Sequence, residues 1–341
     1  MDDVSRAQGL PFGNQAAEAA VQHRPAGVYP MDRRSIPAEA RESVWTAPDG
    51  HRIRRIDWMV EGGARGSILF LPGRGDAYEK YLETLGEWHR AGWQVTAADW
   101  RGQAGSGRLG RDAHTGHVDD FATWIGDLAA LWREWREGNS APHILMGHSM
   151  GGHLTLRAVS DGRVDPVALV LSAPMLDFAG PKLPAGLLHG VARLLRSVGD
   201  PARPAWKWSE KPGELPAARQ ELLTHDDQRY ADEVWWREQR PELGMGPGSW
   251  GWVERAYASM RGLMVPGVLE RVKIPVLLLA AEHDRLVGIG AIREAARRLP
   301  QATLLEFGTE ARHELLRESD PVRSRAMEAI TRFLDEHTPK R

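Results

Sequence analysis

Short apolar runs that alternate with helical patterns are the feature that most constrains the fold of this chain. The runs have the length of buried strands: Ser67–Leu71, Trp93–Ala98, Ile144–Gly147, Val167–Leu171, Ile274–Ala280 and Thr303–Phe307. Apolar residues also recur at helical spacing over residues 118–132 and 322–334. Strands that alternate with helices predict an α/β fold, in which a mostly parallel central sheet carries helices on both faces.

The N-terminal part of the chain lacks this alternation. Residues 1–42 mix prolines and glycines with small and polar residues and show no sustained period, which predicts an extended arm. Ser43–Ala47 and His51–Val60 then flank the turn signal Pro48-Asp49-Gly50, and together they predict a strand hairpin. The strand-rich core should therefore begin at residue 43.

The alternation stops again over residues 178–272. Prolines, helix-like apolar stretches and several tryptophans gather there: Trp206, Trp208, Trp235, Trp236, Trp250 and Trp252. Aromatic side chains of this kind line apolar pockets, although they equally form the core of a small domain. We therefore expect an α/β core over residues 43–177 and 273–341, with an inserted cap over residues 178–272.

Charge and cysteine content exclude several functions. The chain has 44 basic and 46 acidic residues and a formal net charge of -2, without a basic stripe that would favour a nucleic-acid partner. It has no cysteine, which excludes disulfides and cysteine nucleophiles and fits a reducing compartment. The first residues are acidic where a signal peptide would be basic, and no apolar window is long enough to span a membrane. We expect a cytoplasmic protein.

The sequence Gly147-His148-Ser149-Met150-Gly151 contains a Gly-x-Ser-x-Gly motif between a predicted strand and a predicted helix. A serine nucleophile at such a junction occupies a tight turn, and glycines at 147 and 151 let the neighbouring backbones pass closely. The motif can arise by chance in a chain with 36 glycines, but its strand-to-helix setting favours a nucleophile elbow. We predict that Ser149 is a nucleophile.

A serine hydroxyl needs a base within hydrogen-bond reach and a carboxylate that orients this base. The predicted strand Ile274–Ala280 leads to Glu282 and Asp284, and ligands bind beyond the carboxyl ends of such strands, so either carboxylate could be the acid. His313 follows the next predicted strand, in the loop before the last helix. This position favours His313 as the general base over the other histidines.

Two backbone N–H groups are candidates for an oxyanion hole. One is that of Met150, directly after the nucleophile, and the other is that of Arg74, in the glycine-flanked loop after Ser67–Leu71. The loop could also be an ordinary turn. It is not a phosphate-binding P-loop, because no Gly-Lys-Ser or Gly-Lys-Thr follows it.

These motifs together resemble the monoacylglycerol lipase and lysophospholipase branch of the α/β-hydrolases, which is grouped with the serine aminopeptidase-like hydrolases. The matching segments span most of residues 43–341: Gly147–Gly152, Asp99–Ser106, Gly116–Phe121, Asp284–Val287 and Ala311–Leu316. The resemblance implies an α/β-hydrolase fold with the chain order Ser149, Asp284, His313. By position, it also selects Asp284 rather than Glu282 as the acid.

The chain departs from the family pattern at two places. Pro72-Gly73 stands where the family usually has His-Gly, and Arg101-Gly102-Gln103-Ala104 stands where it usually has Arg-Gly-His-Gly. Neither change removes a predicted member of the triad. The first removes a side chain that usually supports the oxyanion loop, so we expect that loop to be held differently.

The combined expectation is a serine esterase that uses no metal or organic cofactor. Its substrate would be a small ester or lipid, with a lysophospholipid or monoacylglycerol as the class that the resemblance implies. A peptide or amide hydrolase and a non-catalytic ligand-binding member of the fold are the alternatives, because the triad sets the reaction type and the cap sets the substrate. The sequence leaves the oligomeric state open.

Two weaker patterns have alternative interpretations. Asp112, His114 and His117 offer metal-ligand side chains, but their spacing is more typical of a loop and a helix start. Apolar residues at helical spacing over 183–198, with Lys182, Arg193 and Arg196 nearby, predict a cap helix. This helix would either pack on the core or touch a membrane surface transiently.

Overall fold

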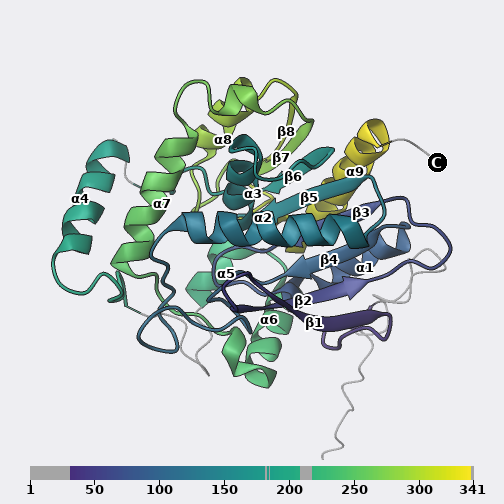
Figure 1. Ribbon diagram of the computed structural model, residues 1–341, viewed down its shortest axis with the longest axis horizontal. Helices are drawn as coiled ribbons and strands as arrows, with labels where there is room; N and C mark the ends of the chain where they lie inside the picture. The colour runs from purple at the N-terminus through teal and green to yellow at the C-terminus, as the bar shows by residue number, and fades with distance from the viewer. Residues whose placement is uncertain (1–30, 181–182, 184, 208–216, 339–341) are drawn as a thin grey trace, which may run out of the picture. The chain divides into compact units, whose positions relative to one another are not determined.

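The computed structural model describes residues 31–180, 183, 185–207 and 217–338. Residues from Arg33 onward belong to one compact unit, and most of the predicted N-terminal arm, together with Lys182 and Trp208, lies outside the described residues. The α/β fold is confirmed by an eight-stranded sheet with the strand order β1-β2-β4-β3-β5-β6-β7-β8 (Figure 1).

The strands fall where the apolar runs predict them. Their bounds are β1 (Ala40–Thr46), β2 (Arg52–Trp58), β3 (Ser67–Leu71), β4 (Gln94–Ala98), β5 (His143–His148), β6 (Ala168–Ser172), β7 (Val276–Ala281) and β8 (Ala302–Phe307). β1 and β2 form the predicted hairpin, and β2 also runs antiparallel to β4. All other pairs are parallel. β1 begins at Ala40, so strand pairing extends into the segment predicted as an arm.

Helices connect the parallel strands. Those outside the segment between β6 and β7 are η1 (Tyr78–Tyr81), α1 (Leu82–Arg90), α2 (Phe121–Gly138), α3 (Met150–Ser160), α8 (Ile289–Arg298), η4 (Leu315–Arg317) and α9 (Asp320–His337). α2 and α9 cover the two predicted helical patterns. α9 follows the start signal closely, because Ser319 is its N-cap residue and Pro321 lies in its first turn.

Alternate residues of the strands face opposite layers of helices. Leu69 and Leu71 of β3 share one buried cluster with residues of α2, α3 and α8. Phe70, which lies between them, points to the other face, where its ring centroid is 5.8 Å from that of Trp88 in α1. Both faces of the sheet are therefore covered, which explains why the central strands are apolar along their whole length.

The chain between the end of β6 at Ser172 and the start of β7 at Val276 carries helices, and this stretch is called the insertion below. Its described elements are α4 (Ala185–Ser197), α5 (Ala217–Leu223), α6 (Asp227–Gln239), η2 (Pro241–Leu243), α7 (Trp250–Leu263) and η3 (Leu269–Arg271). Figure 1 shows α4 beside α7, on the side of α7 that faces away from the sheet. None of the helices in the described part of the chain is both long and apolar enough to cross a membrane.

Candidate active site

Ser149 occupies a strained turn between β5 and α3. Its backbone has φ 53° and ψ -118°, a conformation that a residue with a side chain rarely adopts. The Ser149 N–H donates to the carbonyl oxygen of Ser172 at 2.9 Å, and the Ser149 carbonyl oxygen accepts from the Met175 N–H at 2.9 Å. These bonds to the neighbouring strand and its loop hold the turn, while the Ser149 side chain lines a cavity.

The two motif glycines make this turn sterically feasible. A Cβ atom at Gly151 would lie 2.4 Å from the carbonyl oxygens of Leu71 and Pro72, and one at Gly147 would lie 2.6 Å from the Gly151 backbone. Real Cβ atoms do not approach backbone atoms so closely. Glycine is therefore required at both positions if β5 and α3 are to pack against the end of β3.

His313 and Asp284 form a hydrogen-bonded pair. The His313 Nδ1 and the Asp284 Oδ2 are 2.6 Å apart, and both side chains are almost completely buried. The other Asp284 oxygen, Oδ1, accepts from the N–H groups of Leu286 at 2.7 Å and Val287 at 3.0 Å. The carboxylate is thus fixed by its own loop and in turn fixes the imidazole, whereas Glu282 is exposed and faces Arg293.

The pKa values of this pair move in opposite directions. Burial disfavours the charged imidazole, but the charge of Asp284 and its hydrogen bond outweigh this effect and raise the pKa of His313. Burial likewise disfavours the Asp284 carboxylate, but the charge of His313 and the hydrogen bonds that Asp284 accepts outweigh it and lower the pKa of Asp284. Asp284 is therefore ionised at neutral pH, as an orienting carboxylate must be.

The β3 loop, Pro72–Gly75, passes directly beside Ser149. A Cβ atom at Gly73 would lie 3.1 Å from the Cβ of Ser149. The Gly73 N–H donates to Asp76 Oδ2 at 3.1 Å, and the Gly75 N–H donates to Gln103 Oε1 at 2.6 Å. Arg74 lies between these two anchored residues and lines the same cavity as Ser149 and His313.

Comparisons with known proteins agree with this geometry. Residues 62–320 match the family described as "Serine aminopeptidase, S33". The chain belongs to this family of α/β-hydrolases. Lysophospholipase L2 of Escherichia coli K12 is 28% identical over 307 residues, which cover 87% of this chain and 88% of that protein. The similarity to that relative extends over most of both proteins.

Other relatives cover different shares of the hydrolase. A monoacylglycerol lipase of Mycolicibacterium smegmatis is 28% identical over 140 residues, or 40% of this chain and 47% of that protein. The solved structure of a soluble variant of monoglyceride lipase from Saccharomyces cerevisiae superposes with a TM-score of 0.70 at 18% identity, covering 92% of this chain and 100% of that one. At this identity the structural likeness supports the fold.

The cavity at Ser149 has a volume of about 620 Å³ and mostly apolar walls. The insertion contributes much of these walls, including Trp206, Trp250 and Trp252. Two other tryptophans lie elsewhere: Trp236 Nε1 donates to the Arg33 carbonyl oxygen, and Trp235 packs against Trp236 and Arg34. The described tryptophans of the insertion therefore divide between the cavity and the contact of α6 with Arg33 and Arg34.

A buried charge cluster lies at the wall of the cavity, which Asp76, Lys80 and Glu314 line, and was not predicted. It consists of Asp76, Lys80, Glu233, Glu314 and Arg317. The Lys80 Nζ lies 2.5 Å from Asp76 Oδ1, 2.6 Å from Glu314 Oε1 and 3.0 Å from Glu233 Oε2, and Arg317 pairs with Glu233 and Glu314. The cluster joins the insertion to the core beside the predicted catalytic histidine. The adjacency of Glu314 to His313 in the sequence was the available signal.

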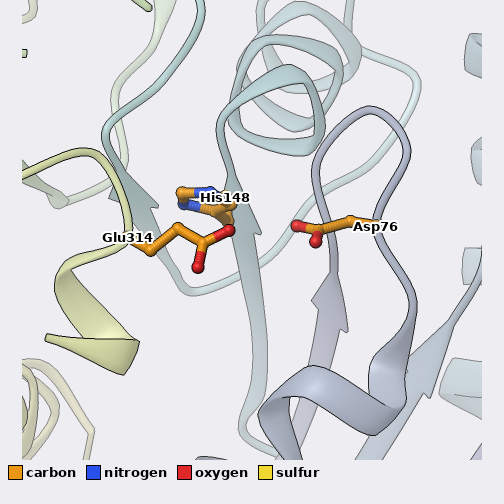
Figure 2. A group of neighbouring side chains, drawn as sticks. All are labelled: Asp76, His148 and Glu314. Carbon is orange, nitrogen blue, oxygen red and sulfur yellow. The ribbon is translucent and has the colours of Figure 1, made fainter. Parts of the chain in front are cut away.

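Two carboxylates of this cluster, together with His148, have the composition of a metal site. Figure 2 shows Asp76, His148 and Glu314 converging from three separate segments, and one ligand atom of each lies within 4.8 Å of the others (Figure 2). However, the ammonium group of Lys80 contacts both carboxylates and supplies the positive charge that a metal ion would bring. Burial and the charge of His313 also lower the pKa of His148 to about 4, so this imidazole stays neutral.

The weaker candidates from the sequence have structural roles. Asp112 accepts hydrogen bonds from the N–H groups of His114 and Thr115, and His117 Nδ1 lies 2.7 Å from the Ser249 hydroxyl. These contacts hold the loop before α2 against the insertion. His153, one turn beyond the nucleophile, is buried against the hydroxyl of Ser259.

Proposed function

We propose that this protein is a serine hydrolase of carboxylic esters and that Ser149, His313 and Asp284 are its catalytic residues. The observation that carries the proposal is the bond of 2.6 Å between His313 Nδ1 and Asp284 Oδ2, in the same cavity as a strained Ser149. Nδ1 is committed to Asp284, so Nε2 is the ring nitrogen left to act on the serine hydroxyl. This is the division of roles that a general base requires.

The reaction follows from these roles. Ser149 Oγ attacks the ester carbonyl carbon while its proton passes to His313 Nε2, and the carbonyl oxygen becomes an oxyanion. The backbone N–H groups of Arg74 and Met150 stabilise this oxyanion. The carbonyl re-forms as the ester C–O bond breaks, and the leaving alcohol takes the proton from His313. Water then attacks the acyl-Ser149 ester with His313 again as the base, which releases the carboxylic acid and restores the serine.

We propose a lysophospholipid or a monoacylglycerol as the substrate. The cavity of about 620 Å³ has room for an acyl chain, and its apolar aromatic walls favour one. The charged groups in the cavity wall, Asp76, Lys80 and Glu314, would face the more polar part of such a molecule. The relatives named above bear lysophospholipase and monoacylglycerol lipase names, which is consistent with this choice.

We further propose that residues 178–272 act as a cap over the core, residues 43–177 and 273–341, and that α4 contacts the lipid surface that carries the substrate. Apolar side chains along one side of α4 and its flanks are strongly exposed: Leu183 (49%), Leu187 (56%), Val191 (48%), Leu194 (63%) and Val198 (59%). The opposite side of α4 packs on α7. An exposed apolar side of this extent favours contact with lipid. Trp206, which is 46% exposed, is a further exposed aromatic side chain of the insertion and also lines the cavity.

The first test is labelling with a fluorophosphonate, read by intact mass, on the wild type and on Ser149→Ala. A single adduct on the wild type that is absent from the folded variant would support an activated Ser149. Turnover of monoacylglycerol, lysophosphatidylcholine, short p-nitrophenyl esters and aminoacyl amides would then rank the substrates. A folded wild type that neither reacts with the probe nor hydrolyses any ester would refute the proposal.

A further inference from the structure

We propose that Gln103 is a positioning residue for the oxyanion hole. The inference rests on the proposed function, because it concerns the loop whose Arg74 N–H is the proposed second donor. Gln103 is buried, at 3% exposure, and its side-chain Oε1 accepts the Gly75 N–H at 2.6 Å. An N–H group needs an acceptor, so the oxygen end of the amide must face Gly75.

The two peptide units next to the proposed donor are both fixed by side chains. The Gly73 N–H belongs to the peptide before the donor's own and donates to Asp76 Oδ2. The Gly75 N–H belongs to the peptide after it and donates to Gln103 Oε1. Because each peptide is planar, fixing the units on both sides restricts the orientation of the Arg74 N–H between them.

The segment that carries Gln103 is itself firmly held. Arg101 makes paired hydrogen bonds to both Asp49 and Asp127, with four distances of 2.7–2.8 Å. Trp100 Nε1 reaches back to the β3 loop and donates to the Pro72 carbonyl oxygen at 2.8 Å. Trp100 therefore holds the first residue of the β3 loop, Pro72, and Gln103 holds its last residue, Gly75. The rigidity of the core can reach the loop through these two contacts.

The backbone around Gln103 adds to this rigidity. The Gly102 N–H donates to the Ser106 carbonyl oxygen at 3.0 Å, and the Ser106 N–H donates to the Gln103 carbonyl oxygen at 2.8 Å. Ala104 has a φ of 44°, which is unusual for a residue with a side chain and is maintained only where the surroundings enforce it. The backbone on both sides of Gln103 is thus held in one conformation.

The two places where the chain departs from the family pattern lie together here. Pro72 has no N–H group and no polar side chain, so it offers the β3 loop no donor of its own. Gln103, the second departure, supplies a carbonyl acceptor to the other end of this loop. In the described part of the chain, Gln103 Nε2 has no hydrogen-bond partner. The carbonyl oxygen is therefore the end of the side chain that the site uses.

The test compares Gln103→Met with the matched control Gln94→Met. Both changes remove a buried amide acceptor at similar volume, but Gln94 bonds to Ser67 and Ser140, away from the cavity. Loss of an oxyanion donor lowers kcat by about 10²–10³, so we expect a displaced donor to cost at least about tenfold. Gln103→Met should lower kcat by this factor with KM within about twofold, whereas Gln94→Met should leave kcat within about twofold.

Three further readouts distinguish positioning from a structural role. The affinity for a trifluoromethyl ketone, whose adduct carries an oxyanion, should fall in parallel with kcat, and Gln103→Glu, which keeps an acceptor, should be faster than Gln103→Met. If Gln103→Met does not fold, Gln103→Asn withdraws the acceptor by one carbon and should lower kcat at least about fivefold. A folded variant without an acceptor at Gly75 but with unchanged kcat overturns the inference; an inactive wild type overturns the proposed function instead.

Discussion

The two halves of the helical insertion are attached to the molecule in different ways. α6 is bound to the core through ionic groups that are mostly buried: Arg229 pairs with Glu83 and with the exposed Asp320, and Glu233 pairs with Lys80 and Arg317. α4 instead packs on α7, through pairs of His189 and Arg196 with Glu254, and exposes its apolar side. Directional ionic contacts thus fix the position of α6, whereas α4 exposes apolar surface to water, where it is unfavourable.

This difference indicates that α6 and α4 have different roles within the proposed cap. Buried ion pairs need good geometry to offset the loss of hydration, so they favour a single arrangement of the groups involved. Such an arrangement suits α6, because the charge cluster it shares with the core lies beside His313. An exposed apolar stripe favours contact with another apolar phase, which suits a helix that meets lipid.

The largest expected effect comes from breaking the fixed half. Lys80→Met leaves three buried carboxylates, those of Asp76, Glu233 and Glu314, without their shared cation. Removing one partner of a buried ion pair costs about 3–5 kcal/mol, and we expect a loss of this size in the free energy of unfolding, measured by urea denaturation. Arg196→Met is the matched control on α4, where the partly exposed pair with Glu254 should contribute about 0–1 kcal/mol. Equal losses in the two variants would contradict the comparison.

The sequence predicted the elements that depend on local pattern. β3 has the predicted bounds, and the other strands agree closely, because apolar runs and turn residues act over short distances. The Gly-x-Ser-x-Gly motif likewise placed Ser149 at a strand-to-helix turn. The structure brings Asp284 and His313 together as the chain order suggested, although their catalytic roles stay predictions.

The sequence did not predict the features that depend on pairing between distant residues. Lys80 and Glu233 are more than a hundred positions apart in the printed sequence, and a lone charged residue is usually solvated, so nothing local marked them as buried partners. The support of Gly75 by Gln103 was equally hidden, although the departure from the family pattern indicated that the loop is held differently. The periodicity of α4 predicted a helix but left open which side of it would be buried.

The next effect concerns Arg74, which joins the core to the insertion. Its Nη2 donates to the Gly246 carbonyl oxygen at 2.8 Å, and its guanidinium lies 5.3 Å from the ring centroid of Trp206 and 4.9 Å from that of Trp252. Arg74→Met keeps the backbone N–H but removes these contacts. A hydrogen bond from a charged donor is worth about 1.5–3 kcal/mol, so kcat/KM should fall at least about tenfold.

The control for Arg74→Met is Arg255→Met on α7, which removes a cation that pairs with Glu254 and Asp120 instead of with the β3 loop. Its kcat/KM on a short p-nitrophenyl ester should stay within about twofold of the wild type. If both variants slow to the same degree, the loss reflects a general disturbance of the insertion, and the link through Arg74 has no special importance.

A smaller effect is expected from the exposed half. Leu187→Ser with Leu194→Ser removes two strongly exposed apolar side chains from α4, so the free energy of unfolding should change by less than about 0.5 kcal/mol per site. Each side chain is only about half exposed, so its entry into lipid contributes about 1 kcal/mol, roughly half the lower-to-middle value for full burial. Serine removes this contribution at both sites, so turnover of substrate in vesicles should fall at least about tenfold, with hydrolysis of a short soluble ester unchanged.

The control places a similar change, from an exposed aliphatic side chain to serine, elsewhere. Val44→Ser with Val167→Ser removes two exposed valines, which are 45% and 42% exposed and lie outside the insertion. Turnover in vesicles should not change in this variant. Equal losses in both double variants would mean that α4 is not the contact with lipid, and a loss on the soluble ester as well would place the effect in the cavity.

The smallest expected effect is a shift in the pH dependence of kcat/KM. It tests whether the charge cluster that anchors α6 also influences the reaction. His313 faces Asp284, Glu314, Asp76 and His148, and the carboxylates contribute to its raised pKa. Only the neutral imidazole accepts a proton, so kcat/KM should fall as the pH drops through the raised pKa of His313. Glu314→Gln removes one negative charge and should move this acid limb to lower pH, while Glu254→Gln, at the α4 contact, should leave it in place.

The same shift has a consequence for stability, with a defined sign. Because the folded-state pKa of His313 lies above its unfolded value of about 6.5, its contribution to folding is complete below that value and is lost as the pH rises through the folded pKa. As the pH rises through the folded-state pKa of His313, kcat/KM should therefore increase while the contribution of His313 to stability is lost. Both changes follow the same titration. If Glu314→Gln moves the acid limb but not the pH at which stability is lost, the limb belongs to a group other than His313. The charge cluster would then anchor α6 without changing the pKa of His313.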